Sequence, residues 1–181
     1  RYVIVPDQFS YMMEKKILAE FGERYVFAIQ VVGFRMLSQR ILERVGGIKK
    51  PLLSPVGRSM LISSLALHNK EKLTLYPNSA AYAGFADMAA DAIRELKNYA
   101  ISPTDLKEAA DRLKESELKN KLHDVGLLFS ASETQLHVNF VDTEDQLDIA
   151  IQKLRESDFL NGSEFYFDVF SDFTPKHLEM I

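Results

Sequence analysis

The chain has 181 residues, of which 46% are apolar and 27% are charged, a balance typical of a globular fold. It contains no cysteine, which excludes disulfide bonds, a thiolate nucleophile and thiolate metal ligands. The net charge of −4 at pH 7 excludes a bulk electrostatic attraction to nucleic acid or to an anionic membrane. The apolar runs are too short to cross a bilayer, so we expect no membrane partner. The lack of cysteine suits a reducing cytoplasm, which is the location we expect.

The first 47 residues alternate between short apolar runs and helical patterns. Tyr2–Val5 predicts a buried strand, and a helix is predicted from about Phe9 to Phe21. The apolar run Tyr25–Ile29 predicts a second strand, which a helix from about Phe34 to Val45 follows. Because strands that alternate with helices form parallel sheets, this order predicts an α/β layer.

The stretch from 54 to 156 shows only helical patterns. Ser54-Pro55 is an N-cap followed by a first-turn proline, and it begins a helix that extends to about Leu67. Further helices are predicted at about 79–99, 104–113, 117–135 and 143–155. We therefore predict an all-helical insertion over 54–156, placed between two parts of one α/β core at 1–53 and 157–181.

An apolar run returns at Phe165–Phe170, interrupted by a single acid, Asp168. Aromatic and β-branched residues in such a run predict a strand that is buried on both faces. Open α/β sheets bind their ligands at the carboxyl ends of the strands, so Asp168 is a candidate site residue. Thr174-Pro175 predicts the start of a further helix.

Three short segments carry a resemblance to a known family. They are Val3-Ile-Val-Pro-Asp-Gln-Phe-Ser10, Gly33-Phe-Arg-Met-Leu-Ser-Gln-Arg-Ile-Leu42 and Phe167-Asp-Val-Phe-Ser-Asp-Phe-Thr174. In this order they resemble motifs of superfamily 1 helicases and, more closely, of the AddB/RexB family. Members of that family are the B subunits of bacterial ATP-dependent helicase–nuclease complexes that process DNA double-strand breaks. Ser54–Arg58 and Asp142–Leu147 are similar to the start and the end of the family's helical insertion.

The resemblance assigns DNA contacts to the first two segments. The candidates are Gln8, Phe9, Ser10, Phe34 and Arg35. Superfamily 1 helicases have Thr at the position of Gly33 and His at the position of Arg35. An arginine still suits a phosphate, although the usual grip on DNA is altered. The structural alternative for these segments is an ordinary strand-to-helix turn and a solvated amphipathic helix.

The third segment resembles the Walker B strand, in the form Asp-Gly-Phe-x-x-Phe-Thr-Pro of the AddB/RexB family. The resemblance implies that Asp168 holds Mg²⁺ through a bound nucleotide. Active enzymes have Glu at the next position, where this chain has Val169, which can neither accept nor direct a proton. We therefore assign no catalytic residue.

The sequence contains no Gly-x-x-x-x-Gly-Lys-(Ser/Thr) phosphate loop. Together with the resemblance, the absence of this loop predicts that the chain is an N-terminal fragment. The fragment would hold part of a RecA-like P-loop NTPase domain without its phosphate loop. ATP with Mg²⁺ is the expected cofactor of the full-length parent only, and we expect this fragment to bind neither tightly.

The leading hypothesis is a DNA-binding, hydrolysis-deficient helicase-like module of a complex that serves recombinational repair. The implied partners are single- or double-stranded DNA and an A subunit that forms a heterodimer with the parent. One alternative is an active superfamily 1 helicase or P-loop ATPase, with a catalytic carboxylate from elsewhere, such as Asp172. The other is a helical adaptor without nucleotide chemistry, which predicts that no phosphate loop precedes Arg1.

Overall fold

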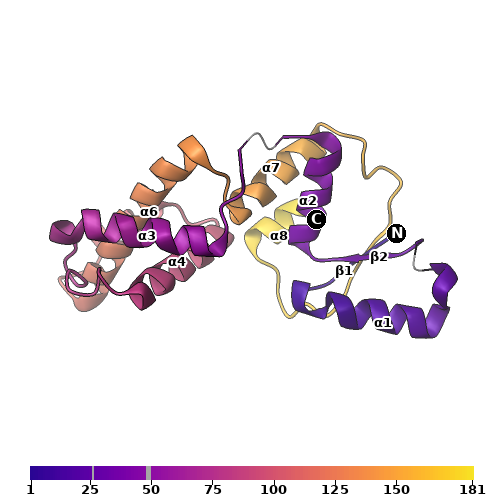
Figure 1. Ribbon diagram of the computed structural model, residues 1–181, viewed down its shortest axis with the longest axis horizontal. Helices are drawn as coiled ribbons and strands as arrows, with labels where there is room; N and C mark the ends of the chain where they lie inside the picture. Colours follow the sequence, from indigo (N-terminus) through magenta and orange to yellow (C-terminus); the bar gives the residue numbers. More distant parts are fainter. Residues whose placement is uncertain (26, 48–49) are drawn as a thin grey trace. The chain divides into compact units, whose positions relative to one another are not determined.

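The computed structural model describes residues 1–25, 27–47 and 50–181, which form two compact units (Figure 1). The sheet unit comprises Arg1–Lys49 and Asp145–Ile181, and the helical unit comprises Lys50–Glu144. Within the described residues, no helix combines the length and the apolar character that a membrane span requires.

A three-stranded parallel sheet lies at the centre of the sheet unit, in the order β2-β1-β3. Strand β1 comprises Tyr2–Ile4, β2 comprises Gln30–Val32 and β3 comprises Phe165–Phe167 (Figure 1). The register places Tyr2 between Gln30 and Phe165. The parallel α/β layer that the sequence predicts is confirmed, and it joins segments from both ends of the chain.

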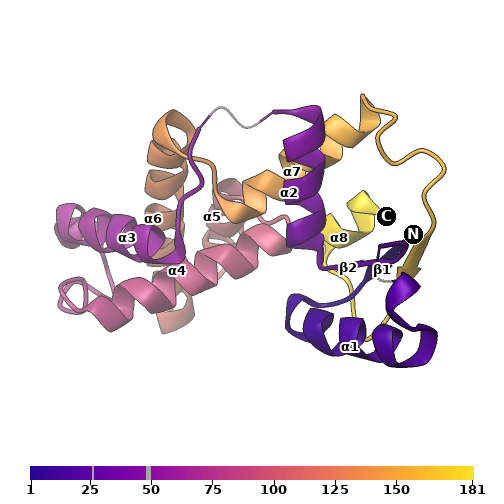
Figure 2. The ribbon, with the colours of Figure 1, turned by 45° about the vertical axis from the view of Figure 1, so that its right-hand side comes forward.

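Helices cover the two faces of this sheet unequally. On one face lie α2 (Phe34–Val45), α7 (Thr143–Arg155) and α8 (Pro175–Met180), while α1 (Ser10–Phe21) lies on the other (Figures 1 and 2). The apolar core between the sheet and the first three helices consists of Tyr2, Ile4, Val32, Phe34, Leu37, Ile41, Leu42 and Ala150. Helix α7 lies within the insertion that the sequence predicts over 54–156. Through Ala150 it nevertheless contributes to the core of the sheet unit.

The predicted strand at 25–29 is wrong, apart from Val26, which lies outside the described residues. Glu23–Tyr25 form a 3₁₀ turn, and β2 begins only at Gln30. The backbone N–H groups of Ala28 and Ile29 both donate to the Tyr25 carbonyl at 3.0 Å. These bonds close the segment into a turn, which overrides the strand preference of its side chains.

The predicted double-sided burial of the last strand is also wrong. Strand β3 has three residues, and Tyr166 and Phe167 are 53% and 38% exposed. It is an edge strand, and α1 packs against β2, which lies at the opposite edge of the sheet. The aromatic run therefore marks a strand in which Phe165 is partly buried and the other two residues are exposed.

The helical unit contains four helices in its described part: α3 (Pro55–His68), α4 (Ala83–Asn98), α5 (Pro103–Asp111) and α6 (Glu117–Asn139) (Figure 2). A serine side chain caps the first turn of α3, α5 and α6, and these residues are Ser54, Ser102 and Ser116. The core includes Ile62, Ala66, Phe85, Ala86, Leu128 and Phe129. Apart from a short 3₁₀ turn at Lys70–Lys72, the described part of this unit follows the predicted helical pattern.

The first and last segments of the helical unit are joined. Leu52 and Val141 form an isolated parallel bridge, and the Arg58 guanidinium forms an ion pair with the buried Asp142 carboxylate. The Lys97 ammonium lies 3.5 Å from Asp142 and 2.9 Å from Glu133. The two segments that resemble the start and end of the family's insertion are thus in contact through Arg58 and Asp142.

Candidate site at the carboxyl ends of the strands

All three strands point the same way, so the segments that follow them meet at one edge of the sheet. Asp7 follows β1, Gly33 follows β2 and Asp168 follows β3. The backbone N–H of Asp168 donates to the Ile4 carbonyl at 3.1 Å, which continues the β1–β3 pairing. One Asp168 carboxylate oxygen accepts the Val169 N–H at 2.8 Å. The sheet thus holds Asp168 directly at its carboxyl edge.

Asp7 connects the two positions at which the second segment departs from superfamily 1 helicases. The Arg35 Nε donates to the Asp7 carboxylate at 3.2 Å, and both side chains are about half exposed. A Cβ atom at residue 33 would lie 1.8 Å from the other Asp7 oxygen. Residue 33 must therefore be glycine while the Asp7 carboxylate occupies this position. Gly33 and Arg35, which look like separate changes in the sequence, form one arrangement with Asp7.

The proposed DNA contacts differ in their access to solvent. Gln8 and Arg35 are exposed, whereas Phe9 and Ser10 are partly buried at the start of α1. Phe34 is 6% exposed, and its ring stacks on the His177 imidazole with centroids 4.1 Å apart. The Phe34 ring therefore packs inside the sheet unit and is not available to stack on a base, whereas Gln8 and Arg35 are accessible to a ligand.

His177 fixes the start of α8 next to this edge, a role that goes beyond the predicted start of a helix at Thr174-Pro175. Its backbone N–H donates to the Thr174 hydroxyl at 3.3 Å, and the Thr174 N–H donates to the His177 Nδ1 at 3.4 Å. Burial lowers the pKa of His177 below its ordinary value, although the Asp172 and Asp7 carboxylates act in the opposite direction. The ring is therefore neutral at pH 7, as its accepting Nδ1 requires.

Val169 adopts a backbone conformation that favours glycine. Its φ of +67° lies in the left-handed region, where a β-branched side chain is strained by about 1–2 kcal/mol. The Val169 side chain is 46% exposed, so it gains little from burial in return. This geometry explains why the motif that the segment resembles has glycine here. It also leaves an apolar side chain where active enzymes have a carboxylate.

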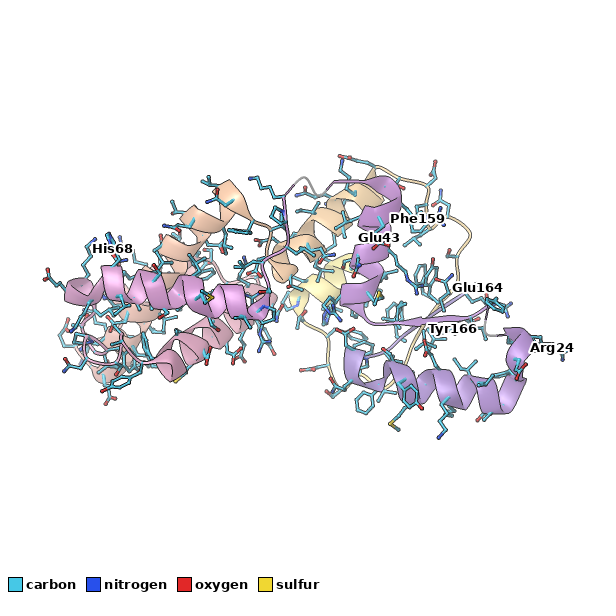
Figure 3. The ribbon with its side chains drawn as sticks, viewed as in Figure 1. Arg24, Glu43, His68, Phe159, Glu164 and Tyr166 are labelled. Atoms are coloured by element: carbon cyan, nitrogen blue, oxygen red, sulfur yellow. The ribbon has the colours of Figure 1, made fainter. Side chains whose placement is uncertain are left out.

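Of the carboxylates near this edge, Asp7 pairs with Arg35, and Asp168 is the candidate ligand of a nucleotide-bound cation. Among the described residues, no group of three or more His, Asp or Glu side chains is arranged to hold a metal ion. Asp172, the alternative catalytic acid, is exposed and accepts the Ser171 hydroxyl at 3.3 Å. A different group of polar side chains lies at the amino ends of β1 and β3. There the Glu164 carboxylate pairs with Arg1 at 2.6 Å and accepts a hydrogen bond from the Tyr166 hydroxyl (Figure 3).

Comparison with known proteins identifies the class to which this fold and site belong. The family described as "ADDB, N-terminal" matches residues 1–181. The chain belongs to this family.

Curated relatives agree with this assignment. Over 179 residues the chain is 38% identical to the B subunit of the ATP-dependent helicase/deoxyribonuclease of Clostridium kluyveri, and the match covers 99% of this chain and 16% of that protein. It is 35% identical over 179 residues to the corresponding B subunits from Clostridium acetobutylicum and Caldanaerobacter subterraneus, with 99% of this chain covered in both cases. These matches cover 16% and 15% of the two proteins. The chain thus spans about one sixth of the length of these relatives.

Proposed function

We propose that this chain is part of a B subunit of an ATP-dependent helicase/deoxyribonuclease and acts there as a DNA-binding, hydrolysis-deficient helicase-like module. Its sheet unit is a partial RecA-like core, and the helical unit is the insertion in that core. Membership in the ADDB N-terminal family and the names of the relatives support this proposal. The proposal implies that the longer protein binds DNA, ATP with Mg²⁺ and an A subunit. Their common task would be the processing of double-strand breaks for recombinational repair.

The proposal depends mainly on two adjacent residues at the end of β3, Asp168 and Val169. Asp168 lies where open α/β sheets bind their ligands, and its carboxylate suits a nucleotide-bound Mg²⁺. Hydrolysis also needs a group that orients the attacking water, and Val169 has no polar side-chain atom for this step. The edge therefore supports nucleotide binding by the longer protein more than it supports turnover.

DNA contact would depend on Arg35 and Gln8. Arg35 is the exposed cation that follows β2, and Asp7 holds its side chain over the edge of the sheet. An arginine in this position can donate two hydrogen bonds to one phosphate, and the Gln8 amide can donate to a second acceptor. With a chain charge of −4, such local contacts have to supply the attraction for DNA.

Helix α2 provides a matched pair of variants that tests DNA binding. Arg35 lies in its first turn at the carboxyl edge, and Arg44 lies in its last turn, roughly 14 Å along the axis at 1.5 Å per residue. We expect Arg35→Gln, in the full-length B subunit with its A subunit, to weaken binding of a fluorescein-labelled single-stranded oligonucleotide about tenfold. The loss of one phosphate contact should also reduce the salt slope by about 1.

Arg44→Gln removes the same charge from another exposed position of the same helix and should change the affinity by less than about twofold. Fluorescence anisotropy at several salt concentrations measures both quantities. Equal losses in the two variants would indicate a general charge effect and would contradict a DNA site at the carboxyl edge. An unchanged affinity in Arg35→Gln would contradict the assignment of Arg35.

A further inference from the structure

A pocket at the amino ends of the strands has no part in the proposed function. It encloses about 560 Å³, which lies within the usual range of small-molecule sites, about 300–1,000 Å³. Tyr2 and Gln30, the first residues of β1 and β2, line it together with the second half of α2. Phe159, from the segment between α7 and β3, lines the same pocket (Figure 3). The sheet unit alone therefore builds this pocket, at the end of the strands that is opposite to Asp168.

Two arginines of α2 supply the positive charge of this pocket. Arg40 and Arg44 lie one helical turn apart, a spacing at which Cβ atoms are about 5–6 Å from each other. The Arg40 guanidinium donates one hydrogen bond to the neutral side-chain oxygen of Gln30, which orients it and leaves its other N–H groups for a ligand. Within the described part of the chain, neither guanidinium forms an ion pair with a carboxylate. Both cations are therefore available to an anion.

Glu43 is the one acid among the described residues that line the pocket. Its carboxylate accepts a hydrogen bond from the Gln39 amide at 2.9 Å, in the row of the helix next to that of Arg40 and Arg44. The lining thus carries two positive charges against one negative charge, in a chain whose net charge is −4. A long polyanion would bring further negative charges towards Glu43, so the pocket suits a compact anion better.

Two phenylalanines from different segments give the pocket surfaces for a planar ring. Phe27 is 92% exposed, more than any other large apolar side chain in the described part of the chain. Phe159 is partly buried in the loop that precedes β3. Nucleobases of every kind stack on aromatic side chains, and a guanidinium fork matches the oxygen atoms of a phosphate. The lining therefore combines groups that recognise both ends of a nucleotide.

We infer that this pocket binds a nucleoside monophosphate group, with its phosphate against Arg40 and Arg44 and its base against Phe27 and Phe159. A phosphate monoester carries a charge of about −1.5 to −2 at pH 7 and offers three terminal oxygens to the two guanidiniums. A phosphodiester inside a strand carries one charge and two such oxygens, so a continuous strand fits less well. The group belongs either to a free mononucleotide or to the phosphorylated end of a DNA strand.

Calorimetric titration of the full-length B subunit with thymidine monophosphate tests this inference. EDTA in the buffer chelates Mg²⁺, so that the Mg²⁺-dependent nucleotide site proposed at the carboxyl edge does not contribute. We expect thymidine monophosphate to bind at least tenfold more tightly than thymidine or inorganic phosphate, because each of these two probes lacks one half of the ligand. Displacement by a 5′-phosphorylated oligonucleotide would identify the strand end as the source of the group, and no displacement would identify the free nucleotide.

Arg44 and Phe27 provide variants that separate the two halves of the site. Arg44→Gln should weaken the binding of thymidine monophosphate at least tenfold, and Arg44→Lys, which retains the charge without the fork, should weaken it less. Phe27→Ala should weaken thymidine monophosphate and leave the affinity for inorganic phosphate unchanged. Arg24→Gln is the matched control, because Arg24 is an exposed arginine of the same unit that lies away from Phe159 (Figure 3). It should leave the affinity unchanged.

The inference is overturned if thymidine monophosphate does not bind, if Arg44→Gln has no larger effect than Arg24→Gln, or if thymidine binds as tightly as its monophosphate. Equal binding of inorganic phosphate would show an anion site that does not recognise a base and would also contradict the inference. Displacement by an unphosphorylated oligonucleotide or by an acidic peptide would show a general surface for polyanions and would contradict it as well.

Discussion

The two units of the chain use charged side chains in opposite ways. In the helical unit, Arg58, Lys97, Asp124 and Asp142 are at most 9% exposed, and ion pairs or backbone hydrogen bonds satisfy them. In the described part of the sheet unit, Lys176 is the one buried charged residue, and Asp7, Arg35 and Asp168 at the strand ends are exposed. Buried charges fix a structure because separating them is costly, whereas exposed charges remain available to a ligand. The helical unit thus buries charges within its fold, whereas the sheet unit leaves those at its strand ends on the surface.

The largest expected effect comes from Asp142→Ala. It removes the carboxylate that faces Arg58 and Lys97 in a buried position, so we expect a loss of about 3–5 kcal/mol in the free energy of unfolding. Asp7→Ala, which breaks the exposed pair with Arg35, should cost less than about 1 kcal/mol. Urea unfolding followed by circular dichroism measures both. Similar costs for the two variants would remove the contrast between the units.

Asp124→Asn should have the next largest effect. The Asp124 carboxylate is fully buried and accepts the backbone N–H groups of Thr74, Leu75 and Tyr76 at 2.7–3.0 Å. Burial opposes its charge, but these bonds and that of His123 prevail and lower its pKa. An amide has one acceptor oxygen, so we expect a loss of about 1.5–3 kcal/mol and faster amide exchange at 74–76. Unchanged exchange there would show that other contacts hold this loop.

Val169→Gly should stabilise the sheet unit by about 1 kcal/mol. Glycine tolerates the φ of +67° without strain, and the gain exceeds the extra entropy that it loses on folding. Val169→Ala retains a Cβ atom and should give only part of this gain. Thermal unfolding of the three proteins measures the order. A lower melting temperature for Val169→Gly would show that the turn after β3 is not strained.

The smallest expected effect is a pH dependence that differs between the units. His177 has a pKa below its ordinary value of 6.5, so its contribution to stability is complete above pH 6.5 and is lost as the pH falls through the folded pKa. Asp124 has a pKa below 3.8, so its contribution persists until the pH falls below that value. Between pH 7 and 5, the protection factor against amide exchange should fall at Ile41 in the sheet unit and not at Leu128 in the helical unit.

His177→Gln should remove this difference, because glutamine does not titrate in that range. A fall in the protection factor at both positions, or in the variant as well, would assign the pH dependence to other groups.

The sequence was sufficient to predict the helices, because serine caps and first-turn prolines mark their starts at Ser54 and Ser102. It also predicted the parallel sheet and placed Asp168 at the end of its last strand. It did not predict the turn at Tyr25, which depends on backbone hydrogen bonds from Ala28 and Ile29 that the side-chain pattern does not reveal. It also did not predict the exposure of β3, which depends on neighbours that are remote in the chain. The burial of Phe34 was missed for the same reason, because its partners lie on β3 and α8.

At the site itself, the sequence indicates single residues but not the contacts between them. The contact of Asp7 with Gly33 and Arg35 joins segments 26 and 28 positions apart, and no local pattern reports it. The φ of Val169 was accessible in principle, because the motif that this segment resembles has glycine at that position.

The central claim is that the carboxyl edge of the sheet holds a nucleotide site without hydrolysis. The most direct test is ATP turnover by the full-length B subunit, separated from its A subunit, with Mg²⁺ and saturating DNA. We predict no turnover above that of the Asp168→Ala variant, because Val169 cannot orient the attacking water. DNA-stimulated turnover that Asp168→Ala abolishes would contradict the claim and would show that this edge is an active ATPase site.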